Sequence, residues 1–148
     1  MRKLLMIFLS AFFLLAGLSG LLFLMSGCSD DEHEVRDSRV TVSVYDDKGN
    51  VVPNVRVKMY DEKQYAAFKR NNRTEPTASV ETDAHGRAVF HLIYHEWFNK
   101  EKQRFLMFVV QYGAGESNYQ IWSSGSTIDA GKDAQVTLQL LHLSPSLK

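Results

Sequence analysis

Two histidines and a glutamate, His91, His95 and Glu96, are the first candidates for chemistry, because imidazole and carboxylate groups bind metal ions. Their order reads His-x-x-x-His-Glu, whereas the helical motif of zinc proteases reads His-Glu-x-x-His. If His91 lies on a strand and His95 in the loop after it, the spacing imposes no ligand geometry. We therefore predict no metal site and no cofactor.

Turn residues could instead offer oxygen ligands to calcium, namely Asp46, Asp47, Asn50 and Asp83. Each of these side chains can equally serve its own turn by bonding to nearby backbone groups. In the segment 83–86, Asp83 can accept hydrogen bonds from backbone amides, and Gly86 can adopt the left-handed conformation. We expect Asp83 and Gly86 to be structural residues of a tight turn.

Nucleophilic catalysis has no candidate motif in this sequence. No Gly-x-Ser-x-Gly element occurs, and the only cysteine, Cys28, directly follows an apolar run. Two carboxylates that meet across loops would leave no sequence pattern. The sequence therefore predicts that the protein is not an enzyme. The alternative is a small hydrolase or a metal protein.

Aromatic residues near the predicted strand ends are better candidates for ligand binding, because exposed rings stack on sugars or anchor protein partners. The candidates are Tyr94, Trp97, Phe98 and Trp122, with Tyr112 and Tyr119 as further aromatics of this kind. The alternative is that the rings close the open ends of a hydrophobic core. Trp97 is the best candidate for exposure, because it lies in a polar loop over residues 95–102.

Alternating hydrophobic residues predict the strands that must position these side chains. Residues 40–45 place three valines on one face, and a turn at residues 46–50 leads to a second alternation over residues 55–60. Further strands are predicted at residues 77–82, 87–92, 104–112, 119–123 and 134–141. The strand at 104–112 is almost wholly apolar, so we expect it to be central and covered on both faces.

One short helix interrupts this pattern at residues 61–70, which are rich in helix-forming residues. Asp61 can cap it, and the Gln64 side chain can bond back to the Asp61 backbone N–H, as in a capping box. Tyr65 and Phe68 share one helical face. We therefore predict an all-β fold, a seven-stranded antiparallel β-sandwich with one helix inserted between strands 2 and 3.

The first 27 residues have the layout of a secretory signal, with Arg2 and Lys3 before an uncharged run. The small residues Ser26 and Gly27 before Cys28 resemble the bacterial lipobox, although Met25 stands where leucine is usual. The resemblance implies that residues 1–27 are removed and that Cys28 carries lipid such as palmitate. An uncleaved anchor is the alternative, because about 20 apolar residues can span a bilayer.

The acidic run Ser29, Asp30, Asp31 and Glu32 resembles the export tag of surface-displayed lipoproteins in some Gram-negative gut bacteria. The alternative is a solvated spacer, because clustered like charges bury nothing. We therefore predict an outer-membrane lipoprotein exposed at the cell surface, with a periplasm-facing protein as the alternative. Residues 28–39 form its tether, residues 40–143 the sandwich and residues 144–148 a tail.

Charge argues against nucleic acid as a partner. The chain has 17 basic and 17 acidic residues, and removal of residues 1–27 leaves 17 − 2 = 15 basic residues, a formal charge of 15 − 17 = −2. This balance lacks the basic footprint of a nucleic-acid-binding domain. A chain with one cysteine also forms no internal disulfide, so the domain must be held by its core.

Two segments carry a family resemblance. Gly49 followed by residues 52–57, and then residues 82–90 from Thr82-Asp83 to Phe90, resemble the carboxypeptidase regulatory-like, or prealbumin-like, family. The resemblance covers about residues 40–92 and implies a prealbumin-like or Ig-like sandwich. It implies little about activity, because such folds host many roles.

These observations lead to one functional hypothesis and one alternative. We expect a non-catalytic binding or adhesion module of the cell envelope, held at the membrane by lipid on Cys28, which recognises a protein or glycan through its sandwich loops. The alternative is a structural accessory subunit of an outer-membrane or periplasmic assembly.

Overall fold

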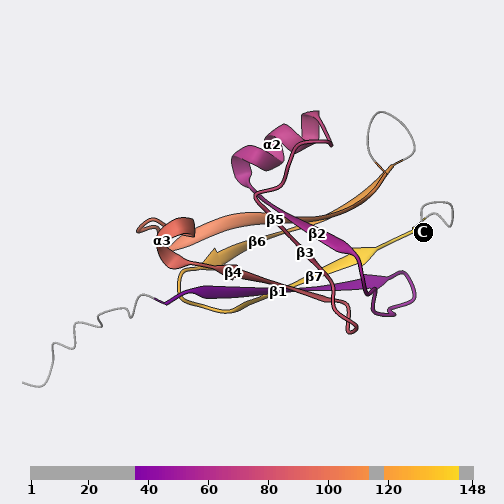
Figure 1. Cartoon of the computed structure of the whole chain (residues 1–148), viewed down its shortest axis with the longest axis horizontal. Helices are drawn as coiled ribbons and strands as arrows, with labels where there is room; N and C mark the ends of the chain where they lie inside the picture. Colours follow the sequence, from indigo (N-terminus) through magenta and orange to yellow (C-terminus); the bar gives the residue numbers. More distant parts are fainter. Residues whose placement is uncertain (1–35, 114–118, 144–148) are drawn as a thin grey trace, which may run out of the picture. The chain divides into compact units, whose positions relative to one another are not determined.

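The computed structural model describes residues 36–113 and 119–143, which form a two-sheet β-sandwich with two helices (Figure 1). The elements are β1 (Ser38–Asp46), β2 (Arg56–Asp61), α2 (Glu62–Arg70), β3 (Ala78–Glu81), β4 (Arg87–Leu92), α3 (Tyr94–Trp97), β5 (Gln103–Tyr112), β6 (Gln120–Asp129) and β7 (Ala134–Leu140). The predicted leader, the acidic run at residues 29–32 and the tail lie outside the described residues. Within the described residues, no helix is long and apolar enough to cross a bilayer.

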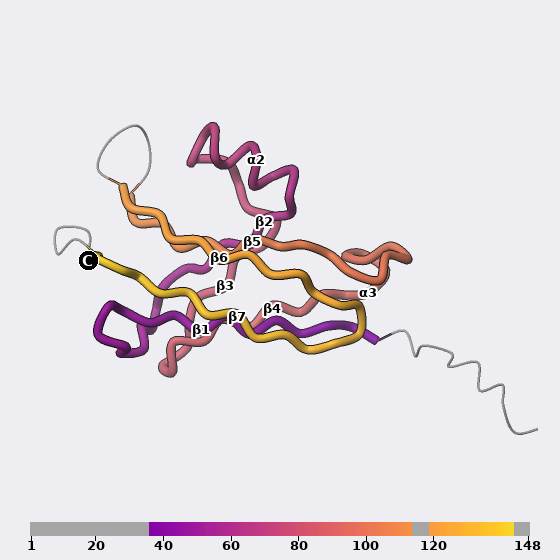
Figure 2. The backbone as a smooth tube through the Cα atoms, turned by 180° about the vertical axis from the view of Figure 1, so that it is seen from behind, coloured from indigo at the N-terminus to yellow at the C-terminus, as the bar shows by residue number. Residues whose placement is uncertain are grey.

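The strands form a three-stranded sheet of order β4-β1-β7 and a four-stranded sheet of order β3-β2-β5-β6. Antiparallel pairing was expected throughout, but β1 and β7 are parallel, from Val40 opposite Ala134 to Asp46 opposite Leu140. The reason is that β6 ends where β1 begins, so a short turn starts β7 beside the start of β1 (Figure 2). The predicted all-antiparallel pairing is therefore wrong at this one pair.

The strand order also bears on the expected Ig-like arrangement. In an Ig constant domain the first two strands are neighbours in one sheet. Here β1 and β2 belong to different sheets, and β1 lies between β4 and β7. The coarser prediction of a β-sandwich is confirmed, whereas the strand order differs from that of the Ig constant domain.

The core lies between the two sheets and is built by alternation along each strand. Val40, Val42 and Val44 of β1 are fully buried, as are Leu106 and Phe108 of β5. The pairing Phe90–Phe108 joins the sheets, with ring centroids 5.5 Å apart. Because every second residue points inward, each strand contributes a row of side chains to this single core.

Helix α2 begins as expected at Asp61, whose Oδ1 accepts a hydrogen bond from the Gln64 backbone N–H at 2.7 Å. The second half of the capping box does not form, because the Gln64 side chain accepts from the Thr77 hydroxyl instead. Phe68 packs with Tyr60 and Val109 on the outer face of the four-stranded sheet. Central β5 is thus covered on both faces at Val109, but Phe105 on the same outer face is 43% exposed.

The prediction of a single helix is wrong, because the described residues also form helix α3, and one strand is longer than predicted. Helix α3 (Tyr94–Trp97) occupies the start of the expected loop, and β6 runs to Asp129 rather than to residue 123. The second half of β6 is rich in serine and has no hydrophobic alternation, so its pattern resembles a loop. At Gly125 a Cβ atom would lie 2.6 Å from Phe105 Cζ and 2.7 Å from Met107 Sδ, so a larger residue would displace the ends of these two side chains.

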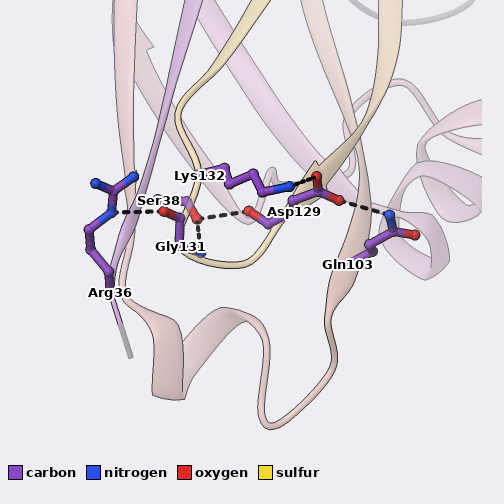
Figure 3. A network of polar contacts seen from close by, with 6 residues as sticks. All are labelled: Arg36, Ser38, Gln103, Asp129, Gly131 and Lys132. Atoms are coloured by element: carbon purple, nitrogen blue, oxygen red, sulfur yellow. Dashed lines mark hydrogen bonds and ion pairs between the residues drawn. The ribbon is translucent and has the colours of Figure 1, made fainter. Parts of the chain in front are cut away.

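Polar contacts hold Arg36 and Ser38, which precede the predicted sandwich start at residue 40, against the rest of the described domain (Figure 3). Arg36 Nε donates to the Gly131 carbonyl at 2.7 Å, and the Ser38 hydroxyl donates to the Asp129 carbonyl at 3.1 Å. The Gly131 N–H in turn donates to Ser38 Oγ at 2.9 Å. These contacts join the end of the predicted tether to the β6–β7 turn.

The same turn is held from the other side by the Asp129 carboxylate. It accepts from Lys132 Nζ at 3.0 Å and from Gln103 Nε2 at 2.8 Å. The hydrogen bonds from Lys132 and then Gln103 lower the pKa of Asp129 below its ordinary value. The turn therefore joins β5, β6 and the domain start in one network.

Candidate functional site: a groove beside helix α2

Two of the turn residues considered for calcium, Asp83 and Asp46, accept hydrogen bonds from nearby backbone groups. Asp83 Oδ1 accepts from the His85 N–H at 2.8 Å and the Arg87 N–H at 3.0 Å, and its Oδ2 accepts from the Arg87 guanidinium at 3.2 Å. The backbone hydrogen bond from Arg87 is the main reason that the pKa of Asp83 is lowered. Asp46 Oδ1 likewise accepts from the Lys48 and Asn50 N–H groups, at 2.9 and 2.8 Å.

The histidine and glutamate candidates lie apart in the fold. His91 is exposed on β4, whereas His95 and Glu96 are exposed on α3. Among the described residues, no three His, Cys, Asp or Glu side chains group together in a way that could hold a metal ion. The observed geometry thus gives these residues no shared site.

Three of the predicted binding aromatics gather around α3, at the end of the sandwich where the described chain begins (Figure 1). Phe98 is fully buried in the core, which corrects its assignment as a binding residue, because a buried ring cannot contact a ligand. Tyr94 and Trp97 are half-buried and pack against the same core. The rings of Tyr94 and Phe98 stack at 6.1 Å.

Trp122 lies at the opposite end of the sandwich and makes its own structural contacts. Its indole N–H donates to the Leu141 carbonyl at 2.9 Å, and its ring meets Tyr112 edge-on with centroids 6.1 Å apart. The structure therefore does not bring Trp122 together with Tyr94 and Trp97. These aromatics close the two ends of the core, which was the alternative considered from the sequence.

A concave surface lies between α2 and the start of β6, away from these aromatic residues. We call this surface the α2 groove; its volume is about 790 Å³. It is lined by Tyr65, Phe68, Lys69, Arg70, Asn71, Asn72, Arg73, Tyr119 and Ile121. The lining thus combines aromatic rings, amides and positive charges.

The charges of the α2 groove come from Lys69, Arg70 and Arg73, all of which are exposed. None of the three forms an ion pair with the described residues, and Lys69 Nζ lies over the Tyr65 ring, 5.4 Å from its centroid. Basic residues in the last turn of a helix also interact favourably with its dipole. Their charge nevertheless stays available to an anion in the groove.

The walls of the α2 groove are fixed by hydrogen bonds. The Tyr65 hydroxyl donates to Ser123 Oγ at 3.2 Å, which ties α2 to β6. The Tyr60 hydroxyl donates to the Thr74 carbonyl at 3.0 Å, and the Arg73 N–H donates to Asn71 Oδ1 at 3.1 Å. Burial, aided by the nearby Glu75 charge, raises the pKa of Tyr60 to about 12, so this phenol stays a donor across the physiological range.

A second concavity of about 440 Å³ lies on the outer face of β1 and β4. Its lining includes Arg39, His91 and Arg87. The charge of Arg87 is already paired with Asp83 at 3.2 Å. This surface therefore offers a weaker positive field than the α2 groove.

Comparison with known proteins shows a distant likeness in fold. No family model and no curated protein matches the chain. A DUF3823 family protein from Parabacteroides merdae ATCC 43184 is similar with a TM-score of 0.43 and 13% identity, over 72% of this chain and 46% of that one. Catechol 1,2-dioxygenase from Pseudomonas arvilla C-1 is similar with a TM-score of 0.38 and 10% identity, over 80% and 56%. The chain thus spans about half of each structure, and neither likeness carries a functional argument.

Sequence reasoning treated the helix at residues 61–70 as a structural insertion and did not connect it with ligand binding. One signal was present, because Lys69, Arg70 and Arg73 fall close together around Asn71-Asn72. Tyr119 was among the aromatic candidates, but its place beside this basic segment depends on the pairing of β6 with β5.

Proposed function

We propose that this chain is a lipid-anchored, non-catalytic binding module of the cell envelope that recognises an acidic glycan through the α2 groove. The observation that supports this proposal is the set of three cations, without ion pairs among the described residues, beside the half-buried ring of Tyr65 and the exposed ring of Tyr119. Tyrosine rings stack on sugar faces, and guanidinium groups bind carboxylates in a planar, two-pronged geometry.

The lining of the α2 groove also supports a non-catalytic role. Among the described residues, its lining includes no carboxylate, histidine or cysteine, which often act as general acids, bases or nucleophiles. A ligand in the groove would meet only donors, rings and amides. Such a surface can hold a ligand but has no group poised to accept its proton.

The anchor and the family are part of the same proposal. The apolar leader that ends at Ser26-Gly27-Cys28 supports lipidation, and the acidic run behind it supports display at the outer surface. The Gly49 turn and the Asp83–Gly86 turn support a prealbumin-like sandwich, since both turns form in the fold. The described chain starts at the α3 end, so an anchored domain would turn its opposite end outward.

A structural role in an envelope assembly is the second candidate. It is supported by β6, a ten-residue strand at the edge of its sheet. An exposed edge offers unpaired backbone groups to another chain. This candidate does not require a ligand in the α2 groove.

The test of glycan recognition compares binding of galacturonic acid oligomers and of galactose oligomers of equal length, by calorimetry on the full chain. We expect the acidic oligomer to bind and the double variant Arg70→Ala/Arg73→Ala to weaken its binding at least tenfold. Hydrogen bonds to charged groups contribute about 1.5–3 kcal/mol each, and about 1.4 kcal/mol corresponds to tenfold in affinity.

The matched control is Lys100→Ala/Lys102→Ala, which removes the same charge from an exposed segment next to α3. This control should bind like the unmodified chain. Equal weakening in both double variants would show unspecific attraction and contradict the proposed site. Equal binding of acidic and neutral oligomers, or of neither, would contradict recognition of an acidic glycan.

A further inference from the structure

Strand β6 lies at the edge of its sheet, and no other described strand pairs with its outer side. The Ala130 N–H donates to the Lys102 carbonyl at 2.9 Å, and the register continues from Gln103 opposite Asp129 without a bulge. Hydrogen-bonded pairs alternate in an antiparallel ladder, so the even-numbered residues of β6 bond to β5. The N–H and C=O groups of the odd-numbered residues therefore point away from the sheet, at Ile121, Ser123, Gly125 and Thr127.

This edge lacks the usual protection of natural sheet edges. Residues 120–128 contain no charged residue and no proline, which are common devices against edge pairing. By contrast, β3 has four residues with an Arg56–Glu81 ion pair at its end, and the edge strand β4 carries Arg87 and His91. Strand β7 is also an edge strand and contains no charged residue. The two edge strands that lack protecting charges, β6 and β7, are thus consecutive in the chain.

Apolar side chains stand beside the free edge. Phe105, 43% exposed, and half-buried Met107 extend from β5 over Gly125 of β6. They fill the space where a Cβ atom of Gly125 would lie. A strand added next to β6 would cover these two side chains as well as the backbone groups.

We infer that β6 pairs with β6 of a second copy of this chain, antiparallel about a two-fold axis at Gly125. The free positions are then self-complementary, because Gly125 faces Gly125, Ser123 faces Thr127, and Thr127 faces Ser123 of the other copy. Ser and Thr are favourable cross-strand neighbours. In this register Asp129, the one charged residue of the paired span 121–129, lies opposite Ile121 of the other copy and away from the other Asp129.

Symmetry brings the apolar side chains together. Adjacent strands lie about 4.8 Å apart, so the Phe105 rings above Gly125 in both copies would come into contact across the axis. Edge pairing joins the two four-stranded sheets into one eight-stranded sheet. This inference does not depend on the proposed glycan site, because the α2 groove and the backbone edge use different groups.

The test measures the mass of the full chain in detergent by sedimentation velocity over a concentration series. We expect a dimer, and we expect Ser123→Pro and Thr127→Lys each to raise its dissociation constant at least tenfold. Ser123 N–H points to the free edge, so proline removes no backbone hydrogen bond of the sheet. It does remove the Oγ that accepts from the Tyr65 hydroxyl, a contact that Thr127→Lys leaves intact. The control Ser79→Pro removes an equivalent outward N–H from the other edge of this sheet and should leave the dimer unchanged.

A second measurement checks the register with a short thiol cross-linker. The double variant Ser123→Cys/Thr127→Cys should cross-link, whereas each single variant should not, because equal residues lie about 14 Å apart across the axis. Cys28 is common to all three variants and sets the background. A monomer at every concentration, a dimer insensitive to both β6 substitutions, cross-linking of the single variants, or a different protein linked to β6 would each overturn the inference.

Discussion

Gly86 occupies a backbone position that only glycine fills without strain. Its φ is +69°, and a Cβ atom there would lie 2.9 Å from the Val44 carbonyl oxygen and 3.0 Å from the Val52 nitrogen. Gly49 in the neighbouring turn has a similar φ of +81°, but nothing lies within 4 Å of its Cβ position. A substitution at Gly49 would therefore cause backbone strain alone, whereas a substitution at Gly86 would cause backbone strain and a steric clash.

The Gly86→Ala substitution should destabilise the domain by about 2–4 kcal/mol, since it adds contact with Val44 to the cost of a left-handed residue. Gly49→Ala should cost about 1–2 kcal/mol, from the backbone strain alone. Chemical denaturation of both variants measures the difference. Equal losses at the two positions would contradict the close approach of Val44 to Gly86.

Residues whose roles are local could be predicted from the sequence. Asp83 was assigned to its turn because its bonding partners lie two and four positions along the chain. The role of Phe98 could not be predicted, because its burial depends on how α3 turns into the core. The basic residues beside Tyr119 were also missed, since their partner ring lies about 50 positions away.

At the scale of elements, α2 connects fold and proposed function. It covers the outer face of the sheet through Phe68 and lines the groove with residues from Tyr65 to Arg70. Its local signals were sufficient to predict it, because the cap and the helix formers are adjacent in sequence. The second half of β6 gave no such signal, because Gly125 is explained only by Phe105 and Met107 of another strand.

The substitution Asp61→Ala should lower the free energy of unfolding by about 1 kcal/mol, because the Gln64 N–H at the start of α2 loses its acceptor. Glu62→Ala is the matched control, which removes an acidic residue from the first turn but leaves the cap intact. Its cost should be about 0.5 kcal/mol. Thermal or denaturant unfolding compares the two, and a larger loss for Glu62→Ala would contradict the capping role.

At the scale of the whole molecule, the β-sandwich could be predicted from seven short strand segments, most of them alternating and one almost wholly apolar. The parallel closure of β1 against β7 could not, because alternation reports which residues face inward and carries no information on strand direction. The order of strands in each sheet is likewise set by packing between distant segments. Both features decide which strands lie at the edges of the sheets, and β6 is one of these edge strands.

Anchoring also belongs to this scale, and Cys28 provides its test. The variant Cys28→Ala should accumulate as a longer precursor that carries no lipid, because processing at a lipobox requires the cysteine. Gel mobility and incorporation of labelled palmitate measure this in cells. The variant Ser38→Ala, within the folded domain, should mature normally. Normal maturation of the Cys28→Ala chain would contradict lipidation.

The parallel pairing of β1 with β7 has a mechanical consequence. Because these strands run in the same direction, Arg36 before β1 and Leu141 after β7 lie at opposite ends of the domain. A force applied between these two residues pulls the paired strands past one another, so the ladder from Val40 to Asp46 is loaded in shear. Shear stretches all the bonds of a ladder together, whereas peeling breaks them singly. If the domain is anchored before β1 and pulled after β7, the force would therefore act in shear on the β1–β7 ladder, the loading that a ladder resists best.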